Sequence, residues 1–258
     1  MGDAARCIIR RMTDHERHIA SVRERLGAAR TAAALTGSGI SAESGLPTFR
    51  GVGGLWRTHR VEELASPTGF ARDPVLVWCW YNERRAAHAK VEPNAGHRAL
   101  AQIEAIVPDF TLVTQNVDSL HQLAGSRNVC ELHGNLREAW CDGCRERRML
   151  ERGVALENFE HVCGGKFRPA VVWFGETLPP EPWERAAAAV GRAEVLLVVG
   201  TSGIVQPAAL LASHLAGPKT FVVDINPEAT PISDHADVVL RGRASEILPQ
   251  LVPEATKT

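Results

Sequence analysis

Three polar side chains follow one short apolar run. Gln115, Asn116 and Asp118 come directly after Phe110–Thr114. Amide and carboxylate groups suit the hydroxyls of a sugar, which both donate and accept hydrogen bonds. Asn and Asp are also good helix caps, so each residue alone could simply begin a helix. The set predicts a sugar-binding strand end, with helix capping as the alternative.

A histidine follows the next apolar stretch. His133 stands between Leu132 and Gly134. An unperturbed imidazole has a pKa of about 6.5, which suits a general base. A lone histidine before a glycine could equally be a loop residue whose hydrogen bonds are all satisfied, so the position needs support from neighbouring groups.

A glycine turn follows an earlier apolar run. Residues 37–42 read Gly-Ser-Gly-Ile-Ser-Ala and fit the G-x-G-x-x-A pattern, in which the backbone approaches a pyrophosphate at a helix start. A plain tight turn is the alternative. A dehydrogenase would have a ribose-binding acid about 20 residues later at the end of a second strand. That strand and its acid are missing here. Pro47 opposes a continuing helix, so the segment after the turn is a loop, and this favours a nucleotide site that does not transfer hydride.

Three of the six cysteines cluster in sequence. Cys141 and Cys144 form one half of a structural zinc site, and Cys163 supplies part of the second half. Glu160 or His161 could complete a tetrahedral set, and a degenerate site without metal is the alternative. The other three cysteines are scattered along the sequence and do not form a disulfide framework. This favours a reducing compartment.

The segments between these motifs alternate in character. Short apolar runs predict buried strands at Thr31–Leu35, Phe110–Thr114, Val195–Val199 and Phe221–Asp224, with weaker runs at Val171–Phe174 and Asp237–Leu240. Helical patterns occupy Asp14–Ala29, Asn94–Ile106, Pro182–Gly191, Pro207–Ala216 and Ala244–Leu251. This alternation predicts an α/β fold with a doubly wound parallel sheet, whose ligands lie at the carboxyl ends of the strands.

Two segments interrupt the alternation. Residues 51–90 predict loops and short helices, and residues 136–169 hold the cysteines with little strand pattern. We expect them to form a second, smaller domain. Residues 1–50, 91–135 and 170–258 would then form the nucleotide-binding domain.

The bulk composition is that of an ordinary globular enzyme. The chain has 258 residues, a net charge of −1 and 45% hydrophobic residues. The small net charge gives no general attraction to nucleic acid or to a membrane surface, and no apolar run approaches the roughly 18 residues of a spanning helix. With no secretory signal apparent, we expect a cytoplasmic monomer.

Together these motifs resemble the successive signatures of the sirtuins, which are NAD-dependent protein lysine deacylases. The resemblance rests on Thr36–Gly51, Thr114–Gly125, Leu132–Gly134, Arg168–Glu176 and Gly200–Ser202, and it covers nearly the whole chain from about residue 20. It implies a Rossmann-like large domain and a smaller zinc-bearing domain, with NAD between them.

The resemblance also implies roles for single residues. The first cofactor segment would comprise Gly37, Ser38, Gly39, Ser41, Glu43, Thr48, Phe49, Arg50 and Trp56. The nicotinamide ribose would be held by Gln115, Asn116, Val117 and Asp118. The remaining NAD contacts would come from Gly200, Thr201, Ser202, Asn226, Pro227, Glu228 and Ala244.

The implied reaction consumes NAD. In sirtuins the acyl oxygen attacks the ribose carbon as nicotinamide leaves, and a histidine then removes a proton from a ribose hydroxyl. The resemblance assigns this base to His133, with Asn116 and Asp118 as its catalytic companions. The products would be free lysine, nicotinamide and an O-acyl-ADP-ribose. A protein mono-ADP-ribosyltransferase using the same site is the main alternative, and these three residues argue against a non-catalytic module.

One further pair bears on the acyl group. Tyr81 and Arg84 are three residues apart, so on a helix they share a face. Arginine suits bidentate recognition of a carboxylate. A solvated helix face with Tyr81 in the core is the alternative. The pair resembles that of sirtuins that accept malonyl- and succinyl-lysine, with Ala65 as the small residue that makes room. It implies removal of acidic acyl groups, while a deacetylase without this preference remains the alternative.

Overall fold

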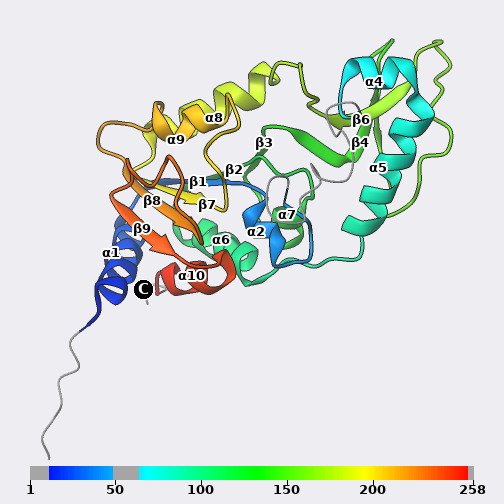
Figure 1. The fold of residues 1–258 in the computed structure, drawn as a ribbon. Coiled ribbons are helices and arrows are strands. Elements are labelled where there is room, and N and C mark those ends of the chain that lie inside the picture. Colours follow the sequence, from blue (N-terminus) through cyan, green and yellow to red (C-terminus); the bar gives the residue numbers. More distant parts are fainter. Residues whose placement is uncertain (1–11, 49–63, 255–258) are drawn as a thin grey trace, which may run out of the picture.

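A six-stranded sheet forms the centre of the structure, a computed structural model that describes residues 12–48 and 64–254 (Figure 1). Its strand order is β3-β2-β1-β7-β8-β9, and every neighbouring pair is parallel. The strands are β1 Thr31–Thr36, β2 Asp109–Thr114, β3 Val129–Glu131, β7 Val195–Val199, β8 Phe221–Asn226 and β9 Val238–Arg241. The predicted doubly wound parallel sheet is confirmed.

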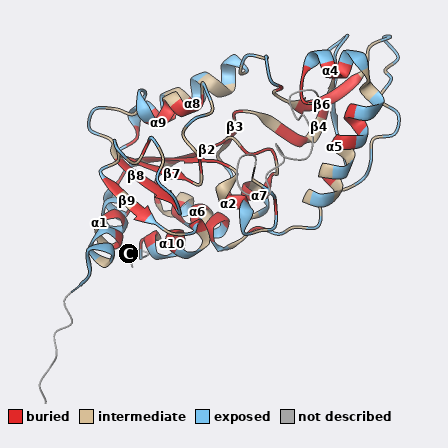
Figure 2. Ribbon diagram, in the orientation of Figure 1, coloured by how far each residue is buried: buried red, intermediate tan, exposed pale blue. Residues whose placement is uncertain are grey.

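Helices cover both faces of this sheet because its strands are apolar on both sides. One face packs against α1 Asp14–Ala28, α6 Ala95–Ile106 and α10 Ala244–Leu251. The other packs against α8 Pro180–Arg192 and α9 Ala209–Ser213. Within β1, Ala32 and Ala34 face the first layer, whereas Ala33 and Leu35 face the second. Figure 2 shows the buried strands between helices whose outer faces are exposed.

A second group of elements lies to one side of the large sheet (Figure 1). It comprises α4 Pro67–Arg72, α5 Pro74–His88 and a three-stranded antiparallel sheet of order β5-β4-β6. These strands are β4 Gly134–Cys141, β5 Arg147–Met149 and β6 Phe167–Val171. Their core is a separate cluster that includes Trp78, Tyr81, Phe167 and Trp173.

The strands of the smaller sheet are weakly marked in the sequence. Residues 136–169 show little strand pattern, although most of β4, all of β5 and the start of β6 fall within them. Antiparallel strands that are exposed on one side mix polar and apolar residues and give no apolar run. The weak run at Val171–Phe174 is not a strand of the large sheet either, because β6 ends at Val171 and pairs with β4.

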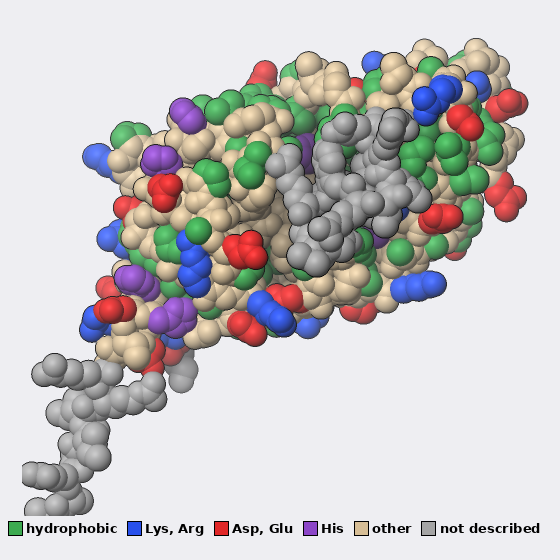
Figure 3. All heavy atoms as spheres, in the orientation of Figure 1, with side chains coloured by type: hydrophobic (Ala, Val, Ile, Leu, Met, Phe, Trp, Pro, Cys, Tyr) green, Lys and Arg blue, Asp and Glu red, His purple; other side chains and the backbone are tan. Residues whose placement is uncertain are grey.

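The surface shows no segregation of charge on the face drawn in Figure 3, where acidic and basic side chains are interspersed. Within residues 12–48 and 64–254, no helix combines the length and the hydropathy that crossing a bilayer requires.

Candidate active site

Two glycine turns meet at the carboxyl edge of the large sheet. The first connects β1 to α2 (Gly39–Ala42), and the second follows the neighbouring strand β7. The Gly39 amide donates to the Gly200 carbonyl at 2.8 Å. A Cβ at Gly39 would lie 2.7 Å from the Gly200 Cα, and one at Gly37 would lie 2.8 Å from the Gly200 oxygen. Both glycines of the first turn are therefore required by the close approach of two backbones.

The residues after β2 bridge these turns. Gln115 donates from Nε2 to Thr201 Oγ1 at 2.9 Å. Asn116 donates from Nδ2 to the Gly37 carbonyl and to Ser41 Oγ, both at 3.1 Å. These side chains, which are far apart in sequence, are thus brought together as the sequence predicted.

Asp118 joins the same network. Its Oδ2 accepts a hydrogen bond from Ser41 Oγ at 2.7 Å. Its Oδ1 accepts one from the Leu120 amide at 2.9 Å, at the start of α7 (Leu120–Leu123). Burial raises the pKa of Asp118, and these two donors oppose that shift. Asp118 therefore belongs to the polar network and also accepts the first backbone amide of α7.

His97 supports the network from behind. It forms a reciprocal cap with Asn94 at the start of α6, and its Nε2 lies 3.4 Å from Ser41 Oγ. Burial and the nearby Arg98 lower its pKa to about 4. A neutral, fully buried histidine at this point has a structural role.

His133 lies between β3 and β4, with its ring fixed by the strand end beside it. Its Nδ1 is 3.0 Å from the Gln115 carbonyl oxygen. Because a carbonyl only accepts hydrogen bonds, Nδ1 carries the proton in this contact. In the neutral ring Nε2 then holds the lone pair. Burial lowers the pKa of His133, and the Gln115 contact partly offsets this shift. The ring is thus neutral at pH 7 and able to accept a proton at Nε2.

A cavity of about 300 Å³ opens beside the network of Ser41, Asn116 and Asp118. It connects the polar network to helix α5. Its lining includes Ser38, Ser41, Asn116, Val117 and Asp118 on one side and Leu46, Pro47, Trp80, Glu83, Arg84 and His88 on the other. Predicted nucleotide residues and Arg84 therefore share one cavity.

Leu46, Pro47, Trp80 and His88 were not predicted as site residues. Leu46, Pro47 and Trp80 have no side-chain group that suggests catalysis, and His88 does not belong to a recognisable sequence motif. Burial and the charge of Arg84 lower the pKa of His88 to about 3. His88 is therefore neutral and adds no positive charge to the cavity.

The other predicted nucleotide residues lie along the same edge. Glu43 accepts from the Ser245 amide at 3.2 Å and from its hydroxyl, beside buried Ala244 at the start of α10. Asn226 is buried at the end of β8 and donates to Asp224.

Further along, Pro227 and Glu228 are exposed, whereas Thr48 and Ser202 are partly buried. Phe49, Arg50 and Trp56 lie outside the described residues, so the structure says nothing about their predicted roles.

The predicted acyl-group residues occupy two environments. Arg84 lines the cavity, and its guanidinium stacks 4.7 Å from the Trp80 ring centroid. Tyr81 is only 1% exposed and lies in the core with Ala65. Its hydroxyl accepts a hydrogen bond from Trp173 Nε1 at 2.8 Å, which leaves its own proton for a second partner. The Arg84 guanidinium lies 5.8 Å from the Tyr81 ring centroid.

A partly buried ion pair lies against Trp173, the hydrogen-bond partner of Tyr81. Arg168 donates to both oxygens of Glu176 at 2.5 and 2.9 Å, and its guanidinium lies 3.4 Å from the Trp173 ring centroid. The Trp173 amide also donates to Glu176 at 2.8 Å. This bidentate pair fixes the indole that contacts the Tyr81 hydroxyl.

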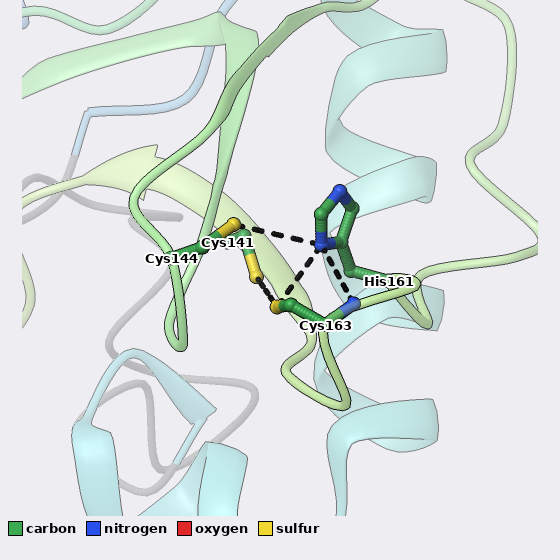
Figure 4. Close-up of side chains that lie close together, drawn as sticks. All are labelled: Cys141, Cys144, His161 and Cys163. Carbon is green, nitrogen blue, oxygen red and sulfur yellow. Dashed lines mark hydrogen bonds between the residues drawn. The ribbon is translucent and has the colours of Figure 1, made fainter.

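The cysteine cluster forms a separate site (Figure 4). Cys141, Cys144, Cys163 and His161 each place a donor atom within 4.8 Å of the other three. Donors around a tetrahedral zinc with sulfur and nitrogen ligands are about 3.5 Å apart. The observed separations include 3.5 Å for Cys141–Cys163 and 3.0 Å for Cys163–His161. Three thiols and an imidazole therefore fit a structural zinc, which the sequence predicted for the three cysteines with the fourth ligand left open.

Comparison with known proteins agrees with this geometry. Residues 37–207 match the model of the Sir2 family. NAD-dependent protein deacylase 2 of Pyrobaculum aerophilum is 48% identical over 238 residues, which cover 92% of this chain and 96% of the relative. NAD-dependent protein deacylase 1 of Archaeoglobus fulgidus is 46% identical, covering 87% and 92% of the two chains.

Solved structures give the same result. A mutant Sir2 homologue in complex with ADP-ribose aligns with a TM-score of 0.86 and 43% identity, covering 93% of this chain and 95% of the other. A Sir2 homologue in complex with NAD aligns with a TM-score of 0.84 and 44% identity, covering 90% and 92%. The chain belongs to the Sir2 family. The relationship to sirtuins suggested by its motifs is confirmed at the level of the family.

Proposed function

We propose that this protein is an NAD-dependent protein lysine deacylase that uses His133 as its base and prefers acyl groups ending in a carboxylate. The observation that carries the first part is the contact of His133 Nδ1 with the Gln115 carbonyl. It keeps the proton of the neutral ring on Nδ1, so Nε2 carries the lone pair that can accept a proton. Relatives at 46–48% identity are named NAD-dependent protein deacylases.

NAD, when bound, would supply the ribose carbon that bonds to the acyl oxygen and nicotinamide as the leaving group. The chain's own residues bind and orient it. Asn116 and Asp118 share Ser41 as a hydrogen-bond partner, so their side chains are held in one arrangement before any ligand arrives. Gln115 is held by Thr201. This preorganisation avoids the cost of ordering polar groups during the reaction.

The preference for acidic acyl groups rests on Arg84. Its guanidinium is the group in the cavity that suits a carboxylate, since a guanidinium makes charge-assisted bidentate bonds. Burial lowers the pKa of Arg84, while Tyr81 and Asp118 raise it, and a guanidinium remains charged at neutral pH. Tyr81, the second residue predicted to hold the carboxylate, is only 1% exposed and does not line the cavity, so the proposal rests on Arg84.

The test compares succinyl- and acetyl-lysine peptides of one sequence. A charge-assisted hydrogen bond contributes about 1.5–3 kcal/mol, so Arg84→Met should lower kcat/KM for the succinyl peptide roughly 10- to 150-fold. The acetyl rate should change little. Arg72→Met is the matched control, because Arg72 is an exposed arginine of the neighbouring helix α4. Equal losses on both peptides, or an acetyl preference in the wild-type enzyme, would refute the acidic preference.

Protein substrates and cellular context follow from the same proposal. A Sir2 mutant of known structure, 29% identical to this chain, holds a p53 peptide together with NAD. We expect this chain likewise to take acyl-lysine segments of other proteins. The five cysteines in the described part of the chain form no disulfide, which supports action in a reducing cytoplasm. We further propose that the enzyme acts as a monomer. Transfer of labelled ADP-ribose to protein without deacylation would instead favour the transferase alternative.

A further inference from the structure

Two tight turns bring the candidate zinc ligands together. In the first, the Arg145 amide donates to the Cys141 carbonyl at 2.9 Å. In the second, the Gly164 amide donates to the His161 carbonyl, also at 2.9 Å. The turns interlock, because a Cβ at Gly165 would lie 2.8 Å from Cys141 Sγ. The cluster is therefore built by backbone geometry on both sides.

The orientation of the His161 ring is specific. Its Nδ1 faces the sulfurs and lies 3.0 Å from Cys163 Sγ and 3.5 Å from Cys144 Sγ (Figure 4). Its Nε2 points the other way and lies 3.1 Å from Glu146 Oε2. The Phe167 ring packs edge-on against the imidazole, with the centroids 5.1 Å apart. The ring is thus held on two sides that do not face the sulfurs.

We propose that His161 binds the metal through Nδ1 and that Glu146 is the positioning residue that holds this nitrogen as the donor. A carboxylate accepts a hydrogen bond, so Glu146 keeps the proton of the neutral ring on Nε2 and leaves the Nδ1 lone pair toward the three thiolates. Carboxylate–histidine–metal arrangements of this kind fix the ring and make the ligand more basic. Glu146 lies 15 residues from His161 in sequence and on the other turn.

The alternative ligand Glu160 does not take this place. Its amide donates to Asn158, and the residue pairs with Lys166 across a β-bridge. It is not one of the four residues whose donor atoms converge. The one-residue spacing between His161 and Cys163 makes a compact chelate, which the turn at Gly164 allows because that glycine has φ +84°.

The first experiment identifies the ligand atoms by spectroscopy. Cobalt(II) replaces zinc in the wild-type protein, and its absorption bands distinguish three sulfurs and one nitrogen from four sulfurs. We expect the wild-type spectrum to be of the first type. His161→Cys should shift it to the four-sulfur type while the metal remains bound. A wild-type spectrum that His161→Cys leaves unchanged would overturn the assignment of His161.

The second experiment tests Glu146 by zinc competition with a chromogenic chelator. Loss of such a carboxylate weakens metal affinity about 10- to 100-fold, so Glu146→Ala should raise the zinc Kd by that factor, with partial rescue in Glu146→Asp. Glu160→Ala is the control and should leave the Kd unchanged. An unchanged Kd in Glu146→Ala would overturn the positioning role. Circular dichroism of the zinc-loaded variants establishes that they are folded.

Discussion

The ion pair Arg168–Glu176 offers a quantitative test of how Trp173, the hydrogen-bond partner of Tyr81, is held. Glu176→Gln keeps the shape of the side chain but leaves the Arg168 charge unpaired. Breaking a buried pair costs about 3–5 kcal/mol. The Arg168 side chain is 6% exposed and that of Glu176 is 25% exposed, so solvent reduces the loss to the lower end, about 3 kcal/mol. For a chain of this size that corresponds to a fall in Tm of about 6–12 °C.

The assay is thermal unfolding of Glu176→Gln beside Glu138→Gln. Glu138 pairs with Arg147 at 2.8 Å, but the arginine side chain is 73% exposed. A surface pair contributes at most about 1 kcal/mol, so Tm of this control should fall by no more than about 4 °C. Glu176 also accepts a hydrogen bond from the Trp173 amide. Glu176→Gln should therefore also lower the rate of desuccinylation of the succinyl peptide. Equal Tm values for the two variants would refute the reasoning.

Three other results are expected. Gly39→Ala would place a Cβ 2.7 Å from Gly200 and should abolish NAD binding measured by calorimetry, whereas Gly191→Ala in α8 should be neutral or stabilising; normal affinity in the first variant would contradict the packing argument. The pKa of His97 in the folded protein is lowered to about 4. As pH falls, His97 is therefore protonated at a higher pH in the unfolded state than in the folded state. The free energy of unfolding in urea should therefore decrease between pH 6.5 and 4, by up to about 3 kcal/mol from this residue, and less in His97→Asn; an equal decrease in both would exclude His97 as the cause. Because burial lowers the pKa of His133, the acidic limb of kcat/KM should lie below pH 6.5, and a limb above that value would contradict a neutral resting base.

Much of the large sheet was predictable because its strands are buried on both faces. Runs such as Val195–Val199 are continuously apolar and stand out from their surroundings. The edge strand β3 was not predicted, since it has only three residues and ends in a glutamate. The predicted helix over Pro207–Ala216 is shorter in the structure, where α9 spans Ala209–Ser213.

The polar site was predictable in part. Gln115, Asn116 and Asp118 follow a recognisable strand, and their convergence with the first glycine turn follows from the pairing of β1 with β2. Sequence spacing could not show that Tyr81 is buried behind Trp173 while Arg84 faces the cavity. That difference depends on how α5 packs on β6 and on the loop after it, which are contacts between segments far apart in the chain.

The metal site shows the same limit. The pattern of cysteines predicted three ligands, and the sequence alone left the fourth open between Glu160 and His161. In the structure the turn around Gly164 and the contact with Glu146 bring Nδ1 to the sulfurs. The two glycines after Cys163 mark the turn in the sequence, whereas the contact with Glu146, 15 residues from His161, has no local signature.

The most direct test of the central claim is nicotinamide release from NAD in the presence of a succinyl-lysine peptide. The wild-type protein should release nicotinamide together with free lysine peptide and O-succinyl-ADP-ribose. His133→Ala should remain folded and yield no free lysine peptide. Undiminished deacylation by His133→Ala, or no peptide-dependent release of nicotinamide by the wild-type protein, would contradict the account.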